Sequence, residues 1–308
     1  MTYLDTCQQA SRLLGEGRTL AMAAVDVNRP SQLSPLAALQ VLRPNIGCGK
    51  WLDNDVVFLF EAVRGLLGVA ASQVQGLAQL YLAGPPILLH PSATLVRGTA
   101  EAGGTAIWLL EPWITALAGN SVLYEDDWKR QSVTVLARTE VKHLDELDSR
   151  RRRRETSPGF PNSGQDTELQ DFKDLLLQRH SSCDVKVSGG RKKWAVHGES
   201  APDLTYRVTA ATEYAYGQRH RGEGLNPYPT LSGYAHAGLD VVFAQAPATG
   251  RPDMSTLFEA HEDDAHKVAS VAMRLLAATY EIIALALGVD LAGLHAWERE
   301  VDVFMLDS

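Results

Sequence analysis

Apolar residues recur at the spacing of an amphipathic helix along almost the whole chain of 308 residues. Alternating strand-like runs are missing except at residues 184–199, where a small hairpin or a longer loop would fit. The pattern argues against an α/β fold and predicts an all-α protein: a helical bundle of long antiparallel helices with an irregular central insertion. The predicted helices cover residues 1–14, 56–82, 91–111, 127–150, 167–180, 203–217, 231–246, 256–287 and 290–300, with loops and a short helix at 28–54.

Proline and glycine mark the ends of these helices. We expect the helix that opens at Pro91 to end before Pro112, and Gly288 to cap the last long helix in a left-handed conformation. Gly103 and Gly104 fall inside a predicted helix, where each costs about 1 kcal/mol relative to alanine. Their presence predicts that the backbone of a neighbouring helix approaches closely.

A run of five arginines, residues 150–154, is followed by the segment ETSPGFPNSGQDTE. Like charges repel, and such a polar tract buries too little apolar surface to order itself. We therefore predict a flexible Arg-rich linker at 151–166. It would separate the N-terminal helices of the bundle, residues 1–150, from the C-terminal helices that complete it, residues 167–308.

Composition narrows the function classes. The net charge of −8 and the pI near 5.6 argue against a duplex-DNA binder. Three distant cysteines, Cys7, Cys48 and Cys183, indicate reduced thiols and a cytoplasmic setting. We expect neither a signal peptide nor a membrane span, because the two most apolar stretches carry charges within them.

Two places in the chain combine groups suited to acid–base chemistry. Arg97 and Glu101 are four residues apart and share one helix face, either as a structural pair or as the lining of a cavity. Ser232 and His236 have the same spacing, so His236 is either a proton-transfer group beside a hydroxyl or a hydrogen-bonded core residue.

A polar stripe follows one face of the last long helix. His266, Ser270, Arg274 and Glu281 are separated by four, four and seven residues. This face would be either a solvated outer surface or the lining of a polar pocket.

An acidic residue three positions before a histidine occurs twice, in two different predicted helices. Di-iron carboxylate bundles use this spacing, so a di-iron or di-manganese site is an alternative to a metal-free protein. The acidic first turn of the last long helix would also simply complement the helix dipole. The ligands of the metal alternative would be Glu101, Glu140, His143, Asp263 and His266.

Sparse landmarks over residues 90–300 resemble bacterial all-α proteins that are distantly similar to the HEPN (higher eukaryotes and prokaryotes nucleotide-binding) superfamily. These landmarks are Leu95, Arg97 and Glu101 followed by Trp108-Leu109-Leu110-Glu111-Pro112; Tyr228, Leu231, Ser232 and His236; and Gly288 followed by Trp297. In HEPN ribonucleases an arginine precedes the histidine, whereas Pro229 stands at that position here. The resemblance implies the helical fold, a homodimer and a polar centre around His236.

The resemblance further implies a defence or toxin–antitoxin protein that binds or cleaves RNA, with His236 as the acid/base. The residues assigned to catalysis are His236, Ser232, Arg97 and Glu101, and those assigned to substrate binding are Tyr228, Tyr234, Arg219, Arg221 and Arg274. Two alternatives stay open. One is a small-molecule enzyme or binding protein with a polar pocket inside the bundle. The other is a non-catalytic interaction module that docks through 151–166.

Overall fold

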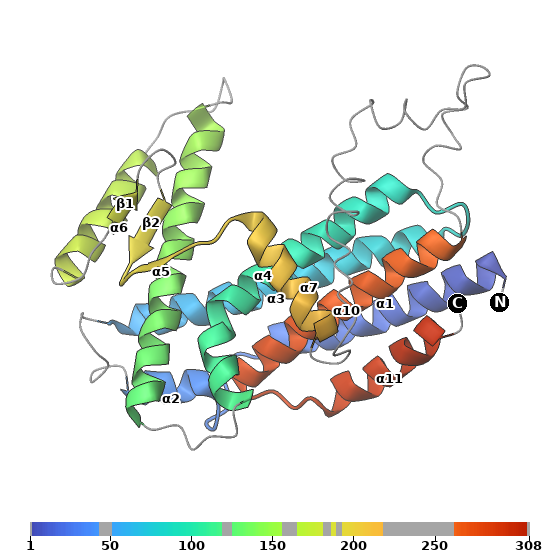
Figure 1. Cartoon of the computed structure of the whole chain (residues 1–308), viewed down its shortest axis with the longest axis horizontal. Coiled ribbons are helices and arrows are strands. Elements are labelled where there is room, and N and C mark those ends of the chain that lie inside the picture. Colours follow the sequence, from blue (N-terminus) through green and yellow to red (C-terminus); the bar gives the residue numbers. More distant parts are fainter. Residues whose placement is uncertain are drawn as a thin grey trace.

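The structure is a computed structural model of the chain, and it describes residues 2–42, 51–118, 125–155, 165–180, 186–188, 193–217 and 262–306. Helices dominate these ranges, and the predicted all-α helical bundle is confirmed (Figure 1). The elements are α1 (Tyr3–Val25), α2 (Pro35–Leu42), α3 (Asp53–Leu82), α4 (Leu89–Ala118), α5 (Glu125–Glu155), α6 (Gln165–Arg179), β1 (Lys186–Ser188), β2 (Lys193–Val196), β3 (Glu199–Ser200), α7 (Leu204–Gly217), α10 (Glu262–Leu287) and α11 (Ala292–Leu306).

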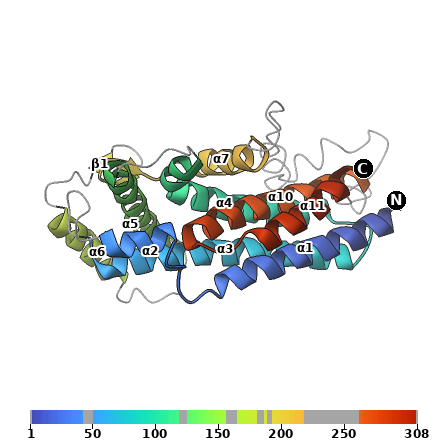
Figure 2. The ribbon, with the colours of Figure 1, turned by 90° about the horizontal axis from the view of Figure 1, so that it is seen from below.

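The long helices α1, α3, α4 and α10 run along the long axis of the molecule and enclose its core (Figures 1 and 2). Helix α11 packs on α1 and α10, and α7 lies over α4 and α10. Helix α10 is the central element, because 19 of its 26 residues are buried, whereas α1 and α3 bury one face each. Burial on most sides explains why its sequence is apolar around most of the helix apart from the polar stripe.

Within the described part of the chain, α10 alone has the length and hydropathy of a membrane-crossing helix. Of the 18-residue window that meets this test, 89% is buried inside the fold. Central helices of helical bundles have the same apolar character, so the pattern fits the position of α10 in the core.

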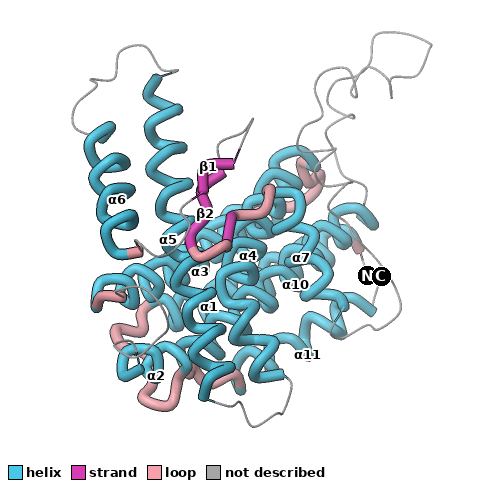
Figure 3. The backbone as a smooth tube through the Cα atoms, turned by 60° about the vertical axis from the view of Figure 1, so that its left-hand side comes forward, coloured by secondary structure: helices cyan, strands magenta, loops and turns pink. Residues whose placement is uncertain are grey.

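Helix α5 crosses one end of the bundle, and α6 and a small antiparallel sheet pack against it (Figure 3). The sheet has the strand order β1-β2-β3, with Val187 opposite Trp194 and Ala195 opposite Ser200. His197 (φ 51°) and Gly198 (φ 79°) make the two-residue turn between β2 and β3. For residues 184–199 the sequence allowed either a hairpin or a longer loop. The structure has the hairpin, extended by a third short strand.

The two glycines inside α4 lie where neighbouring helices touch it. A Cβ atom at position 103 would overlap the Thr279 hydroxyl of α10, and one at position 104 would overlap the backbone of Arg207 in α7. The predicted close approach is therefore confirmed, and it involves two helices on different sides of α4.

The prediction that the helix ends before Pro112 is wrong, because α4 continues to Ala118. Proline has no N–H, so the carbonyl of Trp108, four residues earlier, loses its helical donor. Arg138 of α5 donates from Nη1 to that carbonyl instead, and it also pairs with Glu111. In Figure 1 the end of α4 turns away from the bundle axis, as expected after an internal proline.

The arginine run is helical where the structure describes it, since α5 extends to Glu155. Asp148, one turn earlier, forms ion pairs with Arg151 and Arg152, and burial of this carboxylate makes it a fixed partner for both. The first five residues of the linker predicted at 151–166 are therefore helical, which corrects the prediction for them. Residues 156–164 lie outside the described part of the chain, and α6 begins at Gln165.

The remaining helix boundaries follow local signals. The first helix is longer than the predicted 1–14 and begins with a capping box between Thr2 and Asp5. Gly288 (φ 68°) caps α10 as predicted: its N–H bonds the Leu285 carbonyl, and the next N–H bonds that of Ala284, which is a Schellman motif. The helix predicted at 231–246 lies outside the described residues.

Candidate functional site

The polar stripe on α10 faces inward. His266, Ser270 and Arg274 are 7%, 8% and 3% exposed, so the solvated outer surface is the wrong reading for these three positions. The sequence could not distinguish the two readings, because α11 and α7 cover this side of α10 only in the folded chain.

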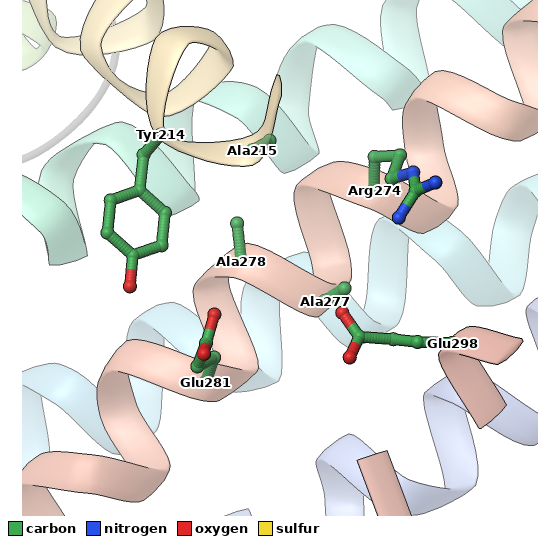
Figure 4. Close-up of a pocket in the computed structure, with 7 residues that line it drawn as sticks. All are labelled: Tyr214, Ala215, Arg274, Ala277, Ala278, Glu281 and Glu298. Carbon is green, nitrogen blue, oxygen red and sulfur yellow. The ribbon is translucent and has the colours of Figure 1, made fainter. Parts of the chain in front are cut away.

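A pocket opens where α7, α10 and α11 meet, and the stripe residue Arg274 lines it (Figure 4). It is shallow: its cavity volume is about 10 Å³, roughly the room of one water molecule, and the space around it is open to solvent. In Figure 4, Ala277 and Ala278 separate Tyr214 and Glu281 on one side from Arg274 and Glu298 on the other. The lining residues are Tyr214, Ala215, Arg274, Ala277, Ala278, Glu281 and Glu298.

The guanidinium of Arg274 is only partly satisfied. Its Nη2 donates to the carboxylate of Asp302, which comes from α11. Its Nε and Nη1 are buried and have no hydrogen-bond partner among the residues that the structure describes. Burial raises the pKa of the nearby Tyr216 to about 12, and the positive charge of Arg274 opposes that rise. The site therefore holds a desolvated cation with free donor capacity.

Two further lining residues of the pocket are acidic. Glu298 of α11 is 5% exposed, and Glu281 lies two turns beyond Arg274 on α10. The polar stripe of α10 thus contributes Arg274 and Glu281 to the pocket. Helix α11 contributes a second acidic residue, Glu298.

The N-terminal part of the stripe has a structural role. His266 donates from Nε2 to the backbone carbonyl of Phe304 and stacks on the Phe304 ring at a centroid distance of 4.2 Å. Ser270 donates to the carbonyl of His266. These contacts fix the end of α11 against α10 and occupy the imidazole nitrogen that a metal would otherwise use.

Arg97 and Glu101 form the predicted ion pair on α4, with 2.6 Å between Arg97 Nε and Glu101 Oε1. Their side chains are 22% and 32% exposed, so the pair lies at the edge of the core. Arg207 of α7 lies nearby and donates to the Thr105 hydroxyl. Burial lowers the pKa of Arg207, an effect that the charge of Glu101 opposes. Neither Arg97 nor Glu101 lines the pocket around Arg274.

A second buried polar centre lies between α5, α6 and α3. The Glu140 carboxylate accepts a hydrogen bond from His180 Nε2 at 3.1 Å, and Arg179 Nη1 lies 3.6 Å from it. The same Arg179 nitrogen donates to Asp55 of α3 at 2.8 Å. Burial raises the pKa of Glu140, while its hydrogen bond from His180 acts in the opposite direction.

This centre continues to the turn of the small sheet. His180 Nδ1 and His197 Nε2 are 3.1 Å apart, and the ring of Trp51 packs on both imidazoles. A neutral His180 that donates from Nε2 to Glu140 accepts at Nδ1, so His197 donates. Burial lowers the pKa of His197 to about 4, helped by the neighbouring His180. Together these contacts hold the small sheet and α6 against α5 and α3.

The structure separates the residues of the proposed dinuclear metal site. Glu101 pairs with Arg97, Glu140 with His180, and His266 with Phe304. Across the described ranges, no group of three or more His, Cys, Asp or Glu side chains has an arrangement that could hold a metal ion.

The other two members of that set also lie apart from a shared centre. His143 packs between the rings of Phe58 and Phe172, and burial lowers its pKa. Asp263 is exposed in the first turn of α10.

The residues of the RNA-directed prediction fall mostly outside the described part of the chain. Those that lie there are His236, Ser232, Tyr228, Tyr234, Arg219 and Arg221. Of the remaining assigned residues, Arg274 is in the pocket, while Arg97 and Glu101 form their own pair on α4.

Sequence reasoning missed Tyr214 and Glu298 in the pocket, and His180 and His197 in the second centre. No spacing connects Glu298 with Arg274, because α10 and α11 meet only through their tertiary packing. Glu140 and His180 are 40 residues apart on different helices. The only sequence signal for this centre was the residue types themselves, an acidic residue and a histidine that each stand among apolar residues.

We compared the chain with protein-family models, with curated proteins and with solved structures, and none of them matches. The case for a function is therefore made from the site itself.

Proposed function

We propose that this protein binds a small polar molecule in the pocket between α7, α10 and α11. One observation carries the proposal: Nε and Nη1 of the buried Arg274 have no partner within the part of the chain that the structure describes. Leaving buried donors unsatisfied costs about 1–3 kcal/mol, and more for a charged group. A ligand oxygen in the pocket would remove that cost.

The surroundings of Arg274 favour a role in ligand binding over a purely structural role. A guanidinium that served only to brace α11 would need only its contact with Asp302, whose side chain is 48% exposed. Arg274 lines the pocket together with the small residues Ala277 and Ala278. Convergent polar groups beside small apolar residues are a common feature of small-ligand sites.

Isothermal titration calorimetry with small probes tests the proposal. Acetate, phosphate, ethanolamine and glycine are each titrated into the full chain, into Arg274→Met and into the control Arg12→Met. Arg12 is an exposed arginine of α1 that pairs with Glu16 and Glu300, away from the pocket. We expect saturable binding of at least one probe that is lost in Arg274→Met and kept in Arg12→Met. Binding of none, or equal binding by both variants, overturns the proposal.

RNA binding or cleavage by a homodimer, with His236 as the acid/base, stays a prediction. Its central residues lie outside the described ranges. Incubating the full chain with RNA, beside His236→Ala, tests that function separately from the pocket.

A further inference from the structure

We propose that His180 and His197 together bind a zinc ion, through Nδ1 of His180 and Nε2 of His197, with Glu140 as the carboxylate that orients His180. This centre shares no residue with the Arg274 pocket, so its test is independent of the proposed function. The hydrogen bond between the two imidazoles is then the metal-free form of the site.

The separation of the two nitrogens fits a shared metal ion. His180 Nδ1 and His197 Nε2 are 3.1 Å apart, and the two rings meet at 77° rather than stacking. Zinc binds imidazole nitrogen at about 2.0–2.1 Å in tetrahedral geometry, which puts two such nitrogens about 3.3 Å apart. A change of about 0.2 Å therefore brings the pair to the separation that the ion requires.

The hydrogen bond from His180 to Glu140 prepares Nδ1 for a metal. Nε2 donates to the carboxylate at 3.1 Å, so a neutral imidazole carries its proton there and its lone pair on Nδ1. Metal-bound histidines almost always donate their other ring N–H to a carboxylate or a carbonyl, which fixes the tautomer and makes the ligand more basic. His197 needs only to move its proton from Nε2 to Nδ1, a change between two neutral tautomers.

The charges next to this pair favour a cation. Glu140 and Asp55 supply two carboxylates, and Arg179, which contacts both, supplies one positive charge. With both carboxylates ionised, the group has a net charge of −1 beside His180, whose side chain is 0% exposed. Charges attract more strongly in such a buried setting than in water, so a metal ion on His180 is stabilised there.

His197 stands at a turn position where other residues are preferred. It has a φ of 51° and precedes Gly198 in the two-residue turn between β2 and β3. Asparagine, aspartate or glycine is favoured at the first position of such a turn. The turn itself therefore does not call for a histidine, whereas a metal ligand beside His180 and Trp51 does.

Two histidines do not complete a zinc site, because zinc takes four ligands and prefers imidazole and thiolate. The sequence holds two thiols close to this centre along the chain. Cys183 follows His180 by three residues, and Cys48 precedes Trp51 by three. Both cysteines lie outside the described residues, so the sequence alone makes them candidates for the remaining positions, beside water.

Zinc binding by the full chain tests the proposal. The purified protein is stripped with EDTA, zinc chloride is titrated in by calorimetry, and the zinc that remains after desalting is measured by elemental analysis. We expect one zinc per chain, and a melting temperature that rises with zinc, because an ion that binds the folded state stabilises it.

Variants locate the ion. His197→Asn keeps a residue suited to the turn and should weaken zinc binding at least about a hundredfold, because it removes a ligand. Glu140→Gln should weaken it about 10–100-fold, the usual effect of losing such a carboxylate. His295→Gln on the exposed face of α11 is the control and should bind zinc normally. If Glu140→Gln fails to fold, His197→Asn in the partly exposed turn carries the test.

Cobalt(II) in place of zinc reports the coordination. A tetrahedral cobalt site absorbs in the visible range, and a bound thiolate adds a charge-transfer band in the near ultraviolet. Visible bands that are lost in His197→Asn support the proposal whether thiolates or water complete the site. Absence of zinc binding by the stripped chain overturns it, and so does equally tight binding by His197→Asn.

Discussion

Gly104 of α4 lies directly against the main-chain carbonyl of Arg207 in α7. The two helices approach so closely that no side chain fits between them at this point. The contact places α7 over α4 and α10, and α7 then delivers Tyr214 to the pocket two turns later. The glycine that predicted a close helix contact in the sequence thus positions α7, which forms one wall of the candidate site.

Gly104→Ala should destabilise the protein by about 3 kcal/mol or more, the upper end of overpacking costs, because the obstacle is backbone and cannot rotate away. Gly65→Ala in α3 is the matched control. Nothing lies within 4 Å of a Cβ at position 65, so alanine should stabilise that helix by about 0.5–1 kcal/mol. Urea unfolding of both variants measures the difference, and equal midpoints would contradict the close contact.

Arg138→Met should cost more stability in the natural chain than in a Pro112→Ala background. In the natural chain Arg138 supplies the donor that Pro112 denies to the Trp108 carbonyl, whereas alanine at 112 restores the helical N–H. We expect a coupling free energy of about 1–2 kcal/mol from the double-mutant cycle, measured by denaturant unfolding. Strict additivity would show that the arginine acts only through its ion pairs with Glu111 and Glu199.

Glu140→Gln should lower the free energy of unfolding by about 1–3 kcal/mol, because it removes the charge that His180 and Arg179 share in a buried setting. The control is Glu146→Gln on the same helix. Glu146 pairs with Lys142 and is 44% exposed, so its loss should cost less than about 0.5 kcal/mol. Thermal unfolding of the two variants at pH 7 compares the sites, and similar shifts would contradict a structural role for the buried centre.

Lowering the pH should weaken the contacts that hold the small sheet against the helices. His197 has a pKa of about 4 in the folded protein, below the ordinary value of 6.5, so the unfolded chain binds more protons between these values. The contribution of neutral His197 is therefore complete above about pH 6.5 and is lost as the pH falls towards 4. Its size is about 1–2 kcal/mol once the partial exposure of the ring is taken into account.

The difference in unfolding free energy between the natural chain and His197→Gln isolates this effect. We expect that difference to grow as the pH rises from 4 to 6.5 and then to level off. The raised pKa of Glu140 acts in the opposite direction, but it is present in both proteins and cancels. His295→Gln on the exposed face of α11 is the control. A pH-independent difference for His197→Gln would contradict the depressed pKa.

The candidate site was only partly readable from the sequence. Arg274 was recognisable because a charged residue recurs on one face of an otherwise apolar helix, a pattern that local sequence carries. Glu298 and Tyr214 were not, since each belongs to a helix with its own periodicity and meets Arg274 only after packing. The histidine pair shows the same limit, because His180 and His197 come together through the fold of the sheet.

The sequence by itself determined the helices, the Gly288 cap and the need for a close helix contact at Gly103 and Gly104, because propensity, capping and periodicity act within a few residues. Only the tertiary structure decided that α4 continues past Pro112, since the missing donor comes from α5. It also decided which polar residues face inward. Burial depends on which helix covers which, and that is settled by long-range packing rather than by local pattern.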